Sequence, residues 1–315
     1  MILTDNTIPA PLVAVIGGVN VDIGGMPFAP PVPKDSNPGQ VQISLGGVGR
    51  NIAHNLRLLD LDVCFLTALG DDFFADRILR SCTELGIDTS RALMVPGGAS
   101  PVYLFISDCD GDMVIAVSDM RICEQISPDY LASHAEALNR ASLVVVDTNV
   151  PAESLLWLAD HCRVPIFADP VSTKKAEKLR PILGKLHTLK PNLLEAELLS
   201  GIRITDDASL RQAAEVLLDS GLQRVFISQG DRGVLAADHH EMLEVPSFPA
   251  AAKNATGAGD AFMAALCRAN LDGFSLQKAA VYATAAAAIA VESSETINPA
   301  LSCSAVRQRL DLFTQ

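Results

Sequence analysis

The chain has 315 residues, of which 49% are hydrophobic and 19% are charged, a composition that supplies a sizeable core and argues against a disordered or fibrous protein. Lys and Arg number 24 against 37 Asp and Glu, so the formal net charge is −13. This charge argues against a general nucleic-acid binder, which needs a basic face. A small anionic ligand is still compatible with it, because backbone N–H groups at a helix start can hold a phosphate.

The sequence lacks the features of secreted and membrane proteins. Its seven cysteines are an odd number, with neither the paired spacing of a zinc site nor the pattern of a disulfide framework. Residues 1–10 lack the basic and apolar segments of a signal peptide. The longest apolar stretch, residues 279–291, is too short to span a bilayer. We therefore expect a cytoplasmic protein with reduced thiols and no membrane partner.

Short apolar runs alternate with helical patterns along most of the chain. Residues 12–16 predict a buried first strand, and residues 208–218 are one example of a predicted helix. Further predicted strands are residues 143–146, 164–168, 186–189 and 224–228. This alternation is typical of an α/β fold with a doubly wound, mainly parallel sheet flanked by helices. Ligands bind beyond the carboxyl ends of such strands, where the following polar residues fall: Asp147, Asn149, Asp169, Asn192 and Glu195.

A second group of strands is predicted outside this alternation. Residues 24–40 are rich in Gly and Pro and predict irregular chain, whereas residues 40–45 alternate polar and apolar side chains. Residues 102–107 and 113–117 flank an Asp-Gly pair, which predicts a β-hairpin. We expect these segments to form a small β appendage that projects from the main body as a flap.

The run 254–262, NATGAGDAF, carries the strongest chemical signal. The small residues Gly257, Ala258 and Gly259 let the backbone approach a ligand, and their N–H groups lie where a helix begins and favours an anion. Asp260 then lies in the first turn, where a carboxylate could take a proton from an attacking hydroxyl. The alternative is an ordinary Gly-rich loop in which Asp260 only caps the helix.

The run 46–51, GGVGRN, is the second signal, because helical spacing follows it at Ile52, Leu56 and Leu59. It is neither a dinucleotide-binding fingerprint, since the third glycine is missing, nor a P-loop, since no Gly-Lys-Ser/Thr occurs. Asn51 would point from the helix start toward whatever the glycines admit. A flexible turn between a strand and a helix is the alternative interpretation.

Two weaker pairs complete the set. Asn20 and Asp22 share a face if their segment is extended, and together they could bind the diol of a sugar. They could equally belong to a turn with a capping Asp. Asn192 and Glu195 share a helical face and could hold the water shell of a Mg²⁺ ion. Alternatively, Asn192 caps the helix in whose first turn Glu195 lies.

These runs, in this order, resemble the ribokinase (PfkB) family of sugar and nucleoside kinases from about residue 12 to 300. The runs 46–51 and 256–260 are the most specific parts of the resemblance. The implied fold is one ribokinase-like α/β domain, residues 1–315, with a small β-sheet lid formed by about 20–45 and 101–118. The implied activity is transfer of the γ-phosphoryl group of ATP, with Mg²⁺, to a sugar hydroxyl.

The resemblance also implies site residues. Asp260 would be the catalytic base, and the amides of Gly257, Ala258 and Gly259 would form the anion hole. Asn192 and Glu195 would order the water shell of Mg²⁺. The implied nucleotide-binding residues are Asn192, Ser228, Gly230, Gly233, Thr256, Gly257 and Gly259. The implied substrate-binding residues are Asn20, Asp22, Gly46, Gly47 and Asn51, to which we add Asp147 at the end of a predicted strand.

Within the family, the chain is most similar to bacterial pseudouridine kinases. The similar stretches are residues 36–39, 46–56, 118–120, 169–172 and 187–192. We therefore expect phosphorylation of the 5′-hydroxyl of pseudouridine, with Tyr103 and Asp119 of the lid region touching the base by stacking and hydrogen bonding. Tyr103 could equally be ordinary lid packing.

The sequence leaves alternatives for the acceptor, for a requirement for K⁺ and for the oligomeric state. The acceptor could be ribose or another nucleoside, and a non-catalytic sugar or nucleoside sensor on the same fold is the alternative from a different class. Many family members have Asp at the position of Asn254, near a monovalent-cation site, so the resemblance gives weak support for K⁺ here. The lid could also pair with a second copy to make a homodimer through its edge strands.

Overall fold

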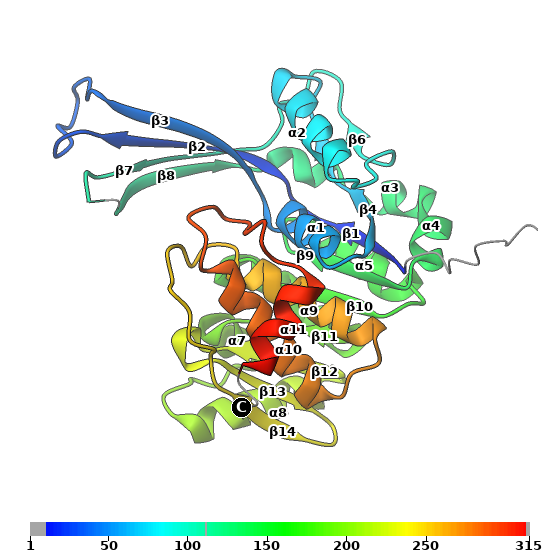
Figure 1. The fold of residues 1–315 in the computed structure, drawn as a ribbon. Helices are drawn as coiled ribbons and strands as arrows, with labels where there is room; N and C mark the ends of the chain where they lie inside the picture. Colours follow the sequence, from blue (N-terminus) through cyan, green and yellow to red (C-terminus); the bar gives the residue numbers. More distant parts are fainter. Residues whose placement is uncertain (1–10, 111, 313–315) are drawn as a thin grey trace, which may run out of the picture.

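The computed structural model describes residues 11–110 and 112–312. Its largest element is a sheet of eight strands in the order β14-β13-β12-β11-β10-β9-β1-β4 (Figure 1). Neighbouring strands from β4 to β12 are parallel, and β13 and β14 are added antiparallel at the other end. The bounds are β1 Leu12–Ile16, β4 Asp62–Leu66, β9 Leu143–Asp147, β10 Ile166–Asp169, β11 Thr188–Leu189, β12 Arg224–Ser228, β13 Val234–Asp238 and β14 Met242–Val245.

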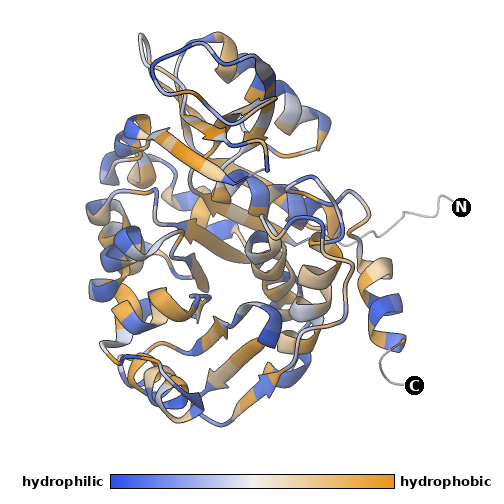
Figure 2. Ribbon diagram, turned by 90° about the vertical axis from the view of Figure 1, so that its left-hand side faces the viewer, coloured by the Kyte–Doolittle hydropathy of each residue, from blue (hydrophilic) through white to orange (hydrophobic). Residues whose placement is uncertain are grey.

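Helices cover both faces of this sheet, because alternate side chains of each buried strand point to opposite faces. Val13 and Val15 of β1 pack with one set of helices: α1 Val48–Leu58, α2 Phe73–Glu84, α9 Ala258–Leu271, α10 Leu276–Ala290 and α11 Cys303–Asp311. Ala14 and Ile16 pack with the other set: α3 Pro128–Ser133, α4 Ala135–Arg140, α5 Ala152–His161, α6 Thr173–Ala176, α7 Leu193–Ser200 and α8 Asp207–Asp219. The hydrophobic interior strands stand out in Figure 2.

Four strands form a second sheet that projects from the body, in the order β3-β2-β7-β8 (Figure 1). Their bounds are β2 Asn20–Pro27, β3 Gly39–Gly46, β7 Val102–Ser107 and β8 Met113–Asp119. The expectation of irregular chain over residues 24–40 is therefore wrong at its ends. A glycine fits β2 at Gly24, because a Cβ atom there would lie 2.5 Å from the ring of Phe105 on the next strand.

The remaining elements are short. β5 (Ala68–Leu69) and β6 (Leu93–Met94) pair with each other, and 3₁₀ helices cover Arg121–Gln125, Glu177–Lys185 and Gly230–Arg232. The strands predicted at 164–168 and 186–189 begin two residues later than expected. The apolar run 279–291 lies almost entirely in α10. In the part of the chain that the structure describes, no helix combines the length and apolar character needed to cross a bilayer.

Candidate active site

Asp260 lies in the first turn of α9, at the carboxyl-end side of the large sheet. α9 begins after Gly257, whose φ of 85° places it in the left-handed region. A Cβ atom at Gly257 would lie 2.1 Å from the carbonyl oxygen of Thr296, so only glycine fits this turn. The turn leaves Asp260 8% exposed. The GAGD run therefore forms a tight turn into a helix with a buried carboxylate behind it.

The two strongest sequence signals meet at this carboxylate. The Asn51 Nδ2 atom donates a hydrogen bond of 2.9 Å to Asp260 Oδ2, across 209 positions of sequence. Asn51 is itself buried, and its Oδ1 atom has no hydrogen-bond partner. Gly47 permits this approach, because its φ of 94° starts α1 beside the backbone of Val19. Helices α1 and α9 thus present one polar pair from two distant motifs.

The electrostatic environment makes Asp260 a weak acid. Burial is the main cause that raises the pKa of Asp260 to about 7, and the nearby charge of Asp169 raises it further. The hydrogen bond from Asn51 and the positive charge of Lys190 act in the opposite direction. A carboxylate with a pKa near neutrality is suited to accept a proton from a hydroxyl and release it later.

Lys190 and Asp169 form a buried ion pair that sequence reasoning missed. The Lys190 Nζ atom lies 3.1 Å from Asp169 Oδ2, and both residues are nearly inaccessible to solvent. Burial would lower the pKa of the Lys190 ammonium, but the charges of Asp169 and Asp260 outweigh it and raise that pKa. Lys190 Nζ lies 2.9 Å from where a Cβ of Gly259 would be. Each residue directly follows a predicted strand and lies in a stretch similar to pseudouridine kinases, but neither signal indicated that the two side chains pair.

A cavity of about 550 Å³ opens beside the start of α9. Lys190 is the one cationic side chain among the described residues that line it, and Phe262, Ala287 and Val291 supply apolar walls. Five of the predicted residues line the cavity: Ser228, Gly230, Gly233, Ala258 and Gly259. Asn192, Thr256 and Gly257 do not line it. Its apolar wall and glycine-rich mouth fit a ligand with a flat ring and an anionic end.

Asn192 and Glu195 form a capping box at the start of α7. The Glu195 backbone N–H donates to Asn192 Oδ1 and the Asn192 backbone N–H donates to Glu195 Oε2, both at 2.9 Å. The capping interpretation of Asn192 is therefore confirmed. Burial raises the pKa of the Glu195 carboxyl, which is 4% exposed. Among the residues described, no three His, Cys, Asp or Glu gather as direct metal ligands.

Asn20 and Asp22 lie on the same face of β2, as the extended interpretation predicted. The Asn20 Nδ2 atom donates to Asp22 Oδ1 at 2.5 Å. A Cβ atom at Gly46 would lie 2.1 Å from Asp22 Oδ2, so the glycine makes room for this carboxylate. Burial raises the pKa of Asp22, which the Asn20 hydrogen bond and the Arg50 charge oppose.

Asp147 has a different environment from the other predicted substrate residues. It is 1% exposed, and its two oxygens accept backbone N–H groups of Gly18 and Asn149, each at 2.8 Å. These bonds fix the turn after β1 that leads to Asn20. The geometry of Asp147 thus suits positioning of the turn better than direct contact with a ligand.

Tyr103 and Asp119 lie on the projecting sheet, as expected. The Tyr103 ring packs 5.8 Å from the ring of Phe105, centre to centre, and its hydroxyl lies 3.4 Å from Met113 Sδ. Asp119 forms an ion pair of 2.7 Å with Arg121, and hydrogen bonds from Arg121 lower its pKa to about 2. Asp119 is therefore charged but already engaged with a cation.

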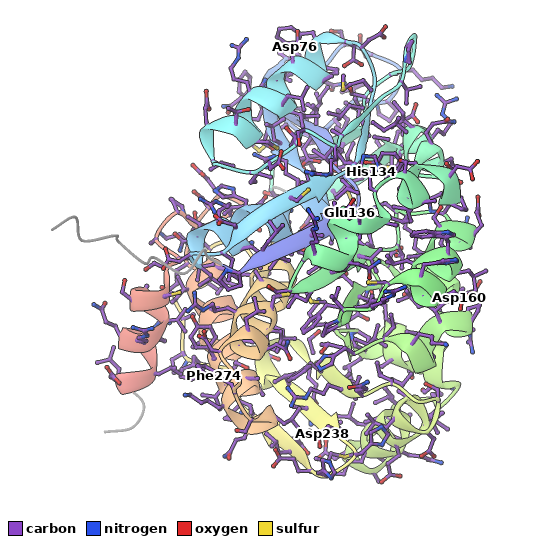
Figure 3. All side chains as sticks on the ribbon, turned by 90° about the vertical axis from the view of Figure 1, so that its right-hand side faces the viewer. Asp76, His134, Glu136, Asp160, Asp238 and Phe274 are labelled. Carbon is purple, nitrogen blue, oxygen red and sulfur yellow. The ribbon has the colours of Figure 1, made fainter. Side chains whose placement is uncertain are left out.

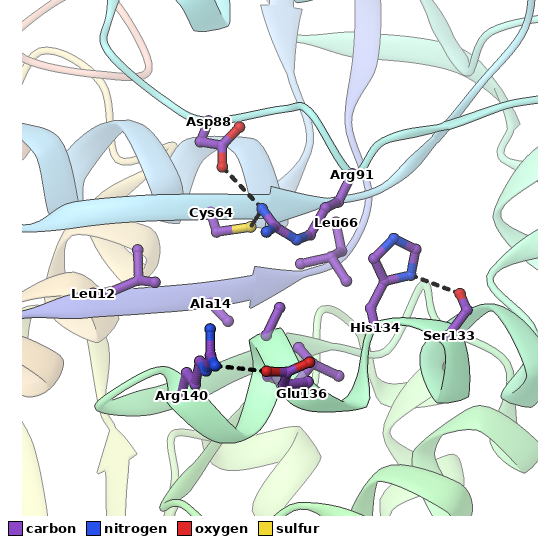
Figure 4. A pocket seen from close by; sticks show the side chains of 12 residues that line it. Leu12, Ala14, Cys64, Leu66, Asp88, Arg91, Ser133, His134, Glu136 and Arg140 are labelled. Atoms are coloured by element: carbon purple, nitrogen blue, oxygen red, sulfur yellow. Dashed lines mark hydrogen bonds and ion pairs between the residues drawn. The ribbon is translucent and has the colours of Figure 1, made fainter.

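A second cavity, of about 470 Å³, lies near the amino-terminal half of β1 (Figure 4). Leu12 and Ala14 line it, and its arginines are paired, Arg91 with Asp88 and Arg140 with Glu136. Figure 3 views the molecule from this side, with His134 and Glu136 labelled. None of the predicted site residues lines this cavity.

Comparison with known proteins identifies the class. The family model for pfkB family carbohydrate kinases matches residues 10–303. The chain therefore belongs to this family of phosphotransferases, which act on a hydroxyl group of a sugar or nucleoside. Its membership confirms the predicted fold class and the predicted enzyme class.

Individual kinases of known sequence or structure are similar to this chain over most of its length. The chain is 38% identical to the pseudouridine kinase of Escherichia coli, covering 92% of this chain and 93% of that one. It is also 38% identical to the uncharacterized sugar kinase YeiI of the same organism, covering 91% and 80%. Among solved structures, a carbohydrate kinase from Agrobacterium tumefaciens is 29% identical with a TM-score of 0.85, covering 96% and 97% of the two chains.

Proposed function

We propose that this enzyme transfers the γ-phosphoryl group of ATP to the 5′-hydroxyl of pseudouridine, giving pseudouridine 5′-phosphate and ADP. The observation that carries the chemistry is the buried Asp260, hydrogen-bonded to Asn51 at the helix start that Gly257 opens. The similarity to a pseudouridine kinase supports the acceptor. The equal identity to the sugar kinase YeiI keeps another sugar or nucleoside as the second candidate. A non-catalytic sensor is disfavoured, because it would not need this set of residues.

In this proposal Asp260 takes the proton of the acceptor hydroxyl while that oxygen attacks the γ-phosphorus. The backbone N–H groups of Gly257, Ala258 and Gly259 face the negative charge of the transferring group at the start of α9. Lys190 adds a positive charge beside Gly259. Positioning and charge stabilisation would therefore supply most of the rate enhancement.

The nucleotide would occupy the 550 Å³ cavity, with its base against the apolar wall and its phosphates toward Gly259. Ser228, Gly230 and Gly233 would border it, and Thr256 would lie beside the anion hole. Mg²⁺, when bound with ATP, would offset phosphate charge. Asn192 and Glu195 fit its water shell, since their side chains lie together at the start of α7, shortly after Lys190 in the chain.

The charge of Glu195 can be tested apart from its capping role. Glu195→Gln keeps an oxygen that accepts the Asn192 N–H, so α7 should keep its cap. We expect the Mg²⁺ concentration for half-maximal turnover to rise roughly tenfold, because groups that orient the ligands of a metal ion typically contribute that much to its affinity. A Mg²⁺ titration of initial rates measures it, and an unchanged midpoint would contradict the assignment.

We propose that the acceptor binds between the body and the projecting sheet, which would serve as the lid of a single catalytic domain. Asn20 and Asp22 would bind the sugar hydroxyls, with Gly46 and Gly47 giving the space and Asn51 aligning Asp260. Tyr103 stands opposite Asp22 in the register of the two strands, so it shares that face. Asp119 stands opposite Val102 in the register, on the other face of the sheet from Tyr103, so we assign the contact with the base to Tyr103 and not to Asp119. Lid closure would exclude water as a competing acceptor.

The opposite face of the lid supports a homodimer. Ile43, Ile23, Leu104 and Val117 are cross-strand neighbours on that face. Val117 is 59% exposed and Ile43 44% exposed. Leu104 is 43% exposed and Ile23 is half-buried, so the row across the four strands holds three exposed apolar side chains. Such a row is typical of a surface that packs against another one. We therefore propose a dimer in which two lids pack face to face, rather than through their edge strands.

The dimer makes a simple prediction about mass in solution. Val117→Arg places a charge within the proposed interface, on its most exposed apolar position in the row, and should give a monomer by light scattering after gel filtration. Leu194→Arg is the matched control, because Leu194 is 63% exposed on α7, away from the lid, and should leave the mass unchanged. A monomeric wild-type protein would refute the dimer.

We also propose that K⁺ is not required. Asn254 brings no charge, and both of its polar atoms are bonded within the protein: Oδ1 accepts from the Thr256 N–H at 2.9 Å, and Nδ2 donates to the Ser294 carbonyl at 3.2 Å. These bonds join the loop before α9 to the segment after α10 and occupy both polar atoms of the Asn254 side chain. The residues present therefore do not favour a cation site.

The proposed function is tested by ADP release with Mg·ATP against pseudouridine, uridine, adenosine, ribose and fructose 6-phosphate, with and without K⁺. We expect ADP release with pseudouridine under the reducing, near-neutral conditions of a cytoplasm, and we expect the rate to change little when K⁺ is added. Preference for another acceptor would keep the kinase and discard the pseudouridine assignment. No ADP release with any of them, together with ligand binding by calorimetry, would favour the sensor.

A further inference from the structure

Arg50 is a buried cation beside the acceptor site that no step of the proposed reaction uses. It lies on α1 directly before Asn51 and is 5% exposed. Its Nη1 atom donates to the Leu45 carbonyl of β3 at 3.2 Å, and its Nη2 atom donates to the Ser81 hydroxyl of α2 at 2.9 Å. Its Nε atom has no hydrogen-bond partner. A buried guanidinium that is only partly satisfied is costly, so its retention needs a reason.

The contacts of Arg50 lie where the lid joins the body. Leu45 is the residue before Gly46, at the end of the lid strand that leads into α1. Arg77 of α2 donates to the carbonyl of Ile43, two residues earlier on the same strand, at 3.2 Å. Carbonyls two residues apart on a strand point the same way. Two helical arginines therefore hold one edge of β3, Arg50 from the interior and Arg77 from the surface.

The charge of Arg50 also acts on Asp22. That carboxylate is packed against Gly46, one residue from the carbonyl that Arg50 binds. The side chains that face Asp22 include no acidic or basic residue: they are Asn20 on the same strand, Ser44 on β3 and Tyr103 on β7. Facing Arg50 itself are Cys82 and Ser81 of α2 and His54 of α1.

We propose that Arg50 is a positioning residue for the acceptor, which fixes the base of the lid on α1 and brings a positive charge to the side of the half-buried Asp22. This inference rests on the proposed function, because it assigns Asp22 to the hydroxyls of the acceptor. It links the lid to the catalytic centre through one helix, since Arg50 holds β3 and the next residue, Asn51, holds Asp260.

The direction of the electrostatic effect follows from the surroundings. Burial raises the pKa of Asp22, and the Arg50 charge opposes that rise. Arg50 keeps its own charge although burial lowers its pKa, because a guanidinium starts from a very high value. Loss of the Arg50 charge therefore raises the pKa of Asp22 further, and the carboxylate gains a proton at a higher pH.

The experiment compares Arg50→Met and Arg50→Lys with the wild type. Arg77→Met is the matched control, because it removes the second contact to β3 while Arg77 itself lies on the exposed side of α2. For Arg50→Met we expect KM for the acceptor to rise roughly tenfold, with KM for ATP unchanged. The rise of acceptor KM at acid pH should begin about one pH unit higher than in the wild type. Arg50→Lys should restore this pH profile but only part of the KM, and Arg77→Met should change neither.

A second readout does not depend on turnover. In protein labelled with ¹³C at the Asp carboxyls, with the Asp22 signal assigned from Asp22→Asn, the Asp22 titration should move to higher pH in Arg50→Met and return in Arg50→Lys. An Asp22 titration that is the same in all three proteins would overturn the inference. Failure of the proposed function can be told apart from failure of this inference. In that case the wild-type enzyme would not phosphorylate pseudouridine, whereas the NMR titration would still show the effect of Arg50 on Asp22.

Discussion

Asp260→Asn is expected to lower kcat about a thousandfold while KM for both substrates changes little, because a general base contributes on the order of 10²–10⁴ to the rate. The amide keeps the size of the carboxylate and an oxygen that can accept the hydrogen bond from Asn51 Nδ2. It cannot accept the proton of the acceptor hydroxyl. Steady-state kinetics with both substrates varied measures the effect, and near-normal kcat would exclude Asp260 as the base.

The pH dependence of the wild type belongs to the same test. Asp260 must be ionised to act, and its pKa is raised to about 7, so kcat/KM should rise with pH up to about 7 and then level off. Asp260→Asn should remove this dependence from its residual activity.

The thermal stability of Asp260→Asn, measured as Tm against pH, shows whether this substitution damages the fold. Because the folded-state pKa of Asp260 lies above its ordinary value of 3.8, the folded protein binds the proton more tightly than the unfolded chain does. The stability that the protonated Asp260 contributes is therefore complete below pH 3.8 and is lost as the pH rises through about 7. The Tm of Asp260→Asn should be at least that of the wild type at pH 8, with the difference shrinking toward acid pH. A large loss of Tm at pH 8 would mean that the substitution damages the fold.

Lys190→Met is the second substitution with a large expected effect. It removes the one cationic side chain among the described residues lining the nucleotide-sized cavity, and we expect kcat to fall roughly a hundredfold, as when one preorganised donor is lost. It also leaves Asp169 buried without its partner, which should cost about 3–5 kcal/mol of unfolding free energy.

The double substitution Lys190→Met with Asp169→Asn separates the two effects. Removing both charges should restore most of the stability, because no unpaired charge remains in the interior. It should not restore turnover, since the positive charge beside Gly259 is still missing. Denaturant unfolding and single-turnover rates on the same samples measure both. Recovery of turnover in the double variant would show that Lys190 only balances Asp169.

Local patterns in the sequence predicted the interior strands of the large sheet and the starts of α1 and α9, but not β4, β13 and β14 at the ends of that sheet. The glycines at 47 and 257 mark turns with positive φ into helices, and each has a physical cause in a backbone atom that a Cβ would strike. The Asp-Gly hairpin and the alternation of 40–45 likewise predicted β7, β8 and β3. The strand at 24–27 was missed because Gly24 makes room for Phe105 and Gly25 for Ile106, and both of these residues lie on another strand, β7.

The site was predictable as a set of motifs but not as an electrostatic unit. Asn51 and Asp260 were selected separately, and their hydrogen bond depends on the packing of α1 against α9. Lys190 and Asp169 lie on neighbouring strands that a sheet brings together, so their pairing has no signature along the chain. Arg50 was visible only as part of a glycine-rich run, since its partners come from β3 and α2. Spacing reveals which residues can share a helix or strand, whereas pairing across elements follows from the fold.

The most direct test of the central claim is the position of the phosphate in the product. Pseudouridine, Mg·ATP and the enzyme are incubated to completion, and the product is examined by ³¹P-coupled proton NMR. We predict phosphorus coupling to the 5′-methylene protons and one ADP formed for each product molecule. Asp260→Asn should form no ADP on the same timescale. Phosphate on a ring hydroxyl, or ADP released with unmodified pseudouridine, would contradict the proposed reaction.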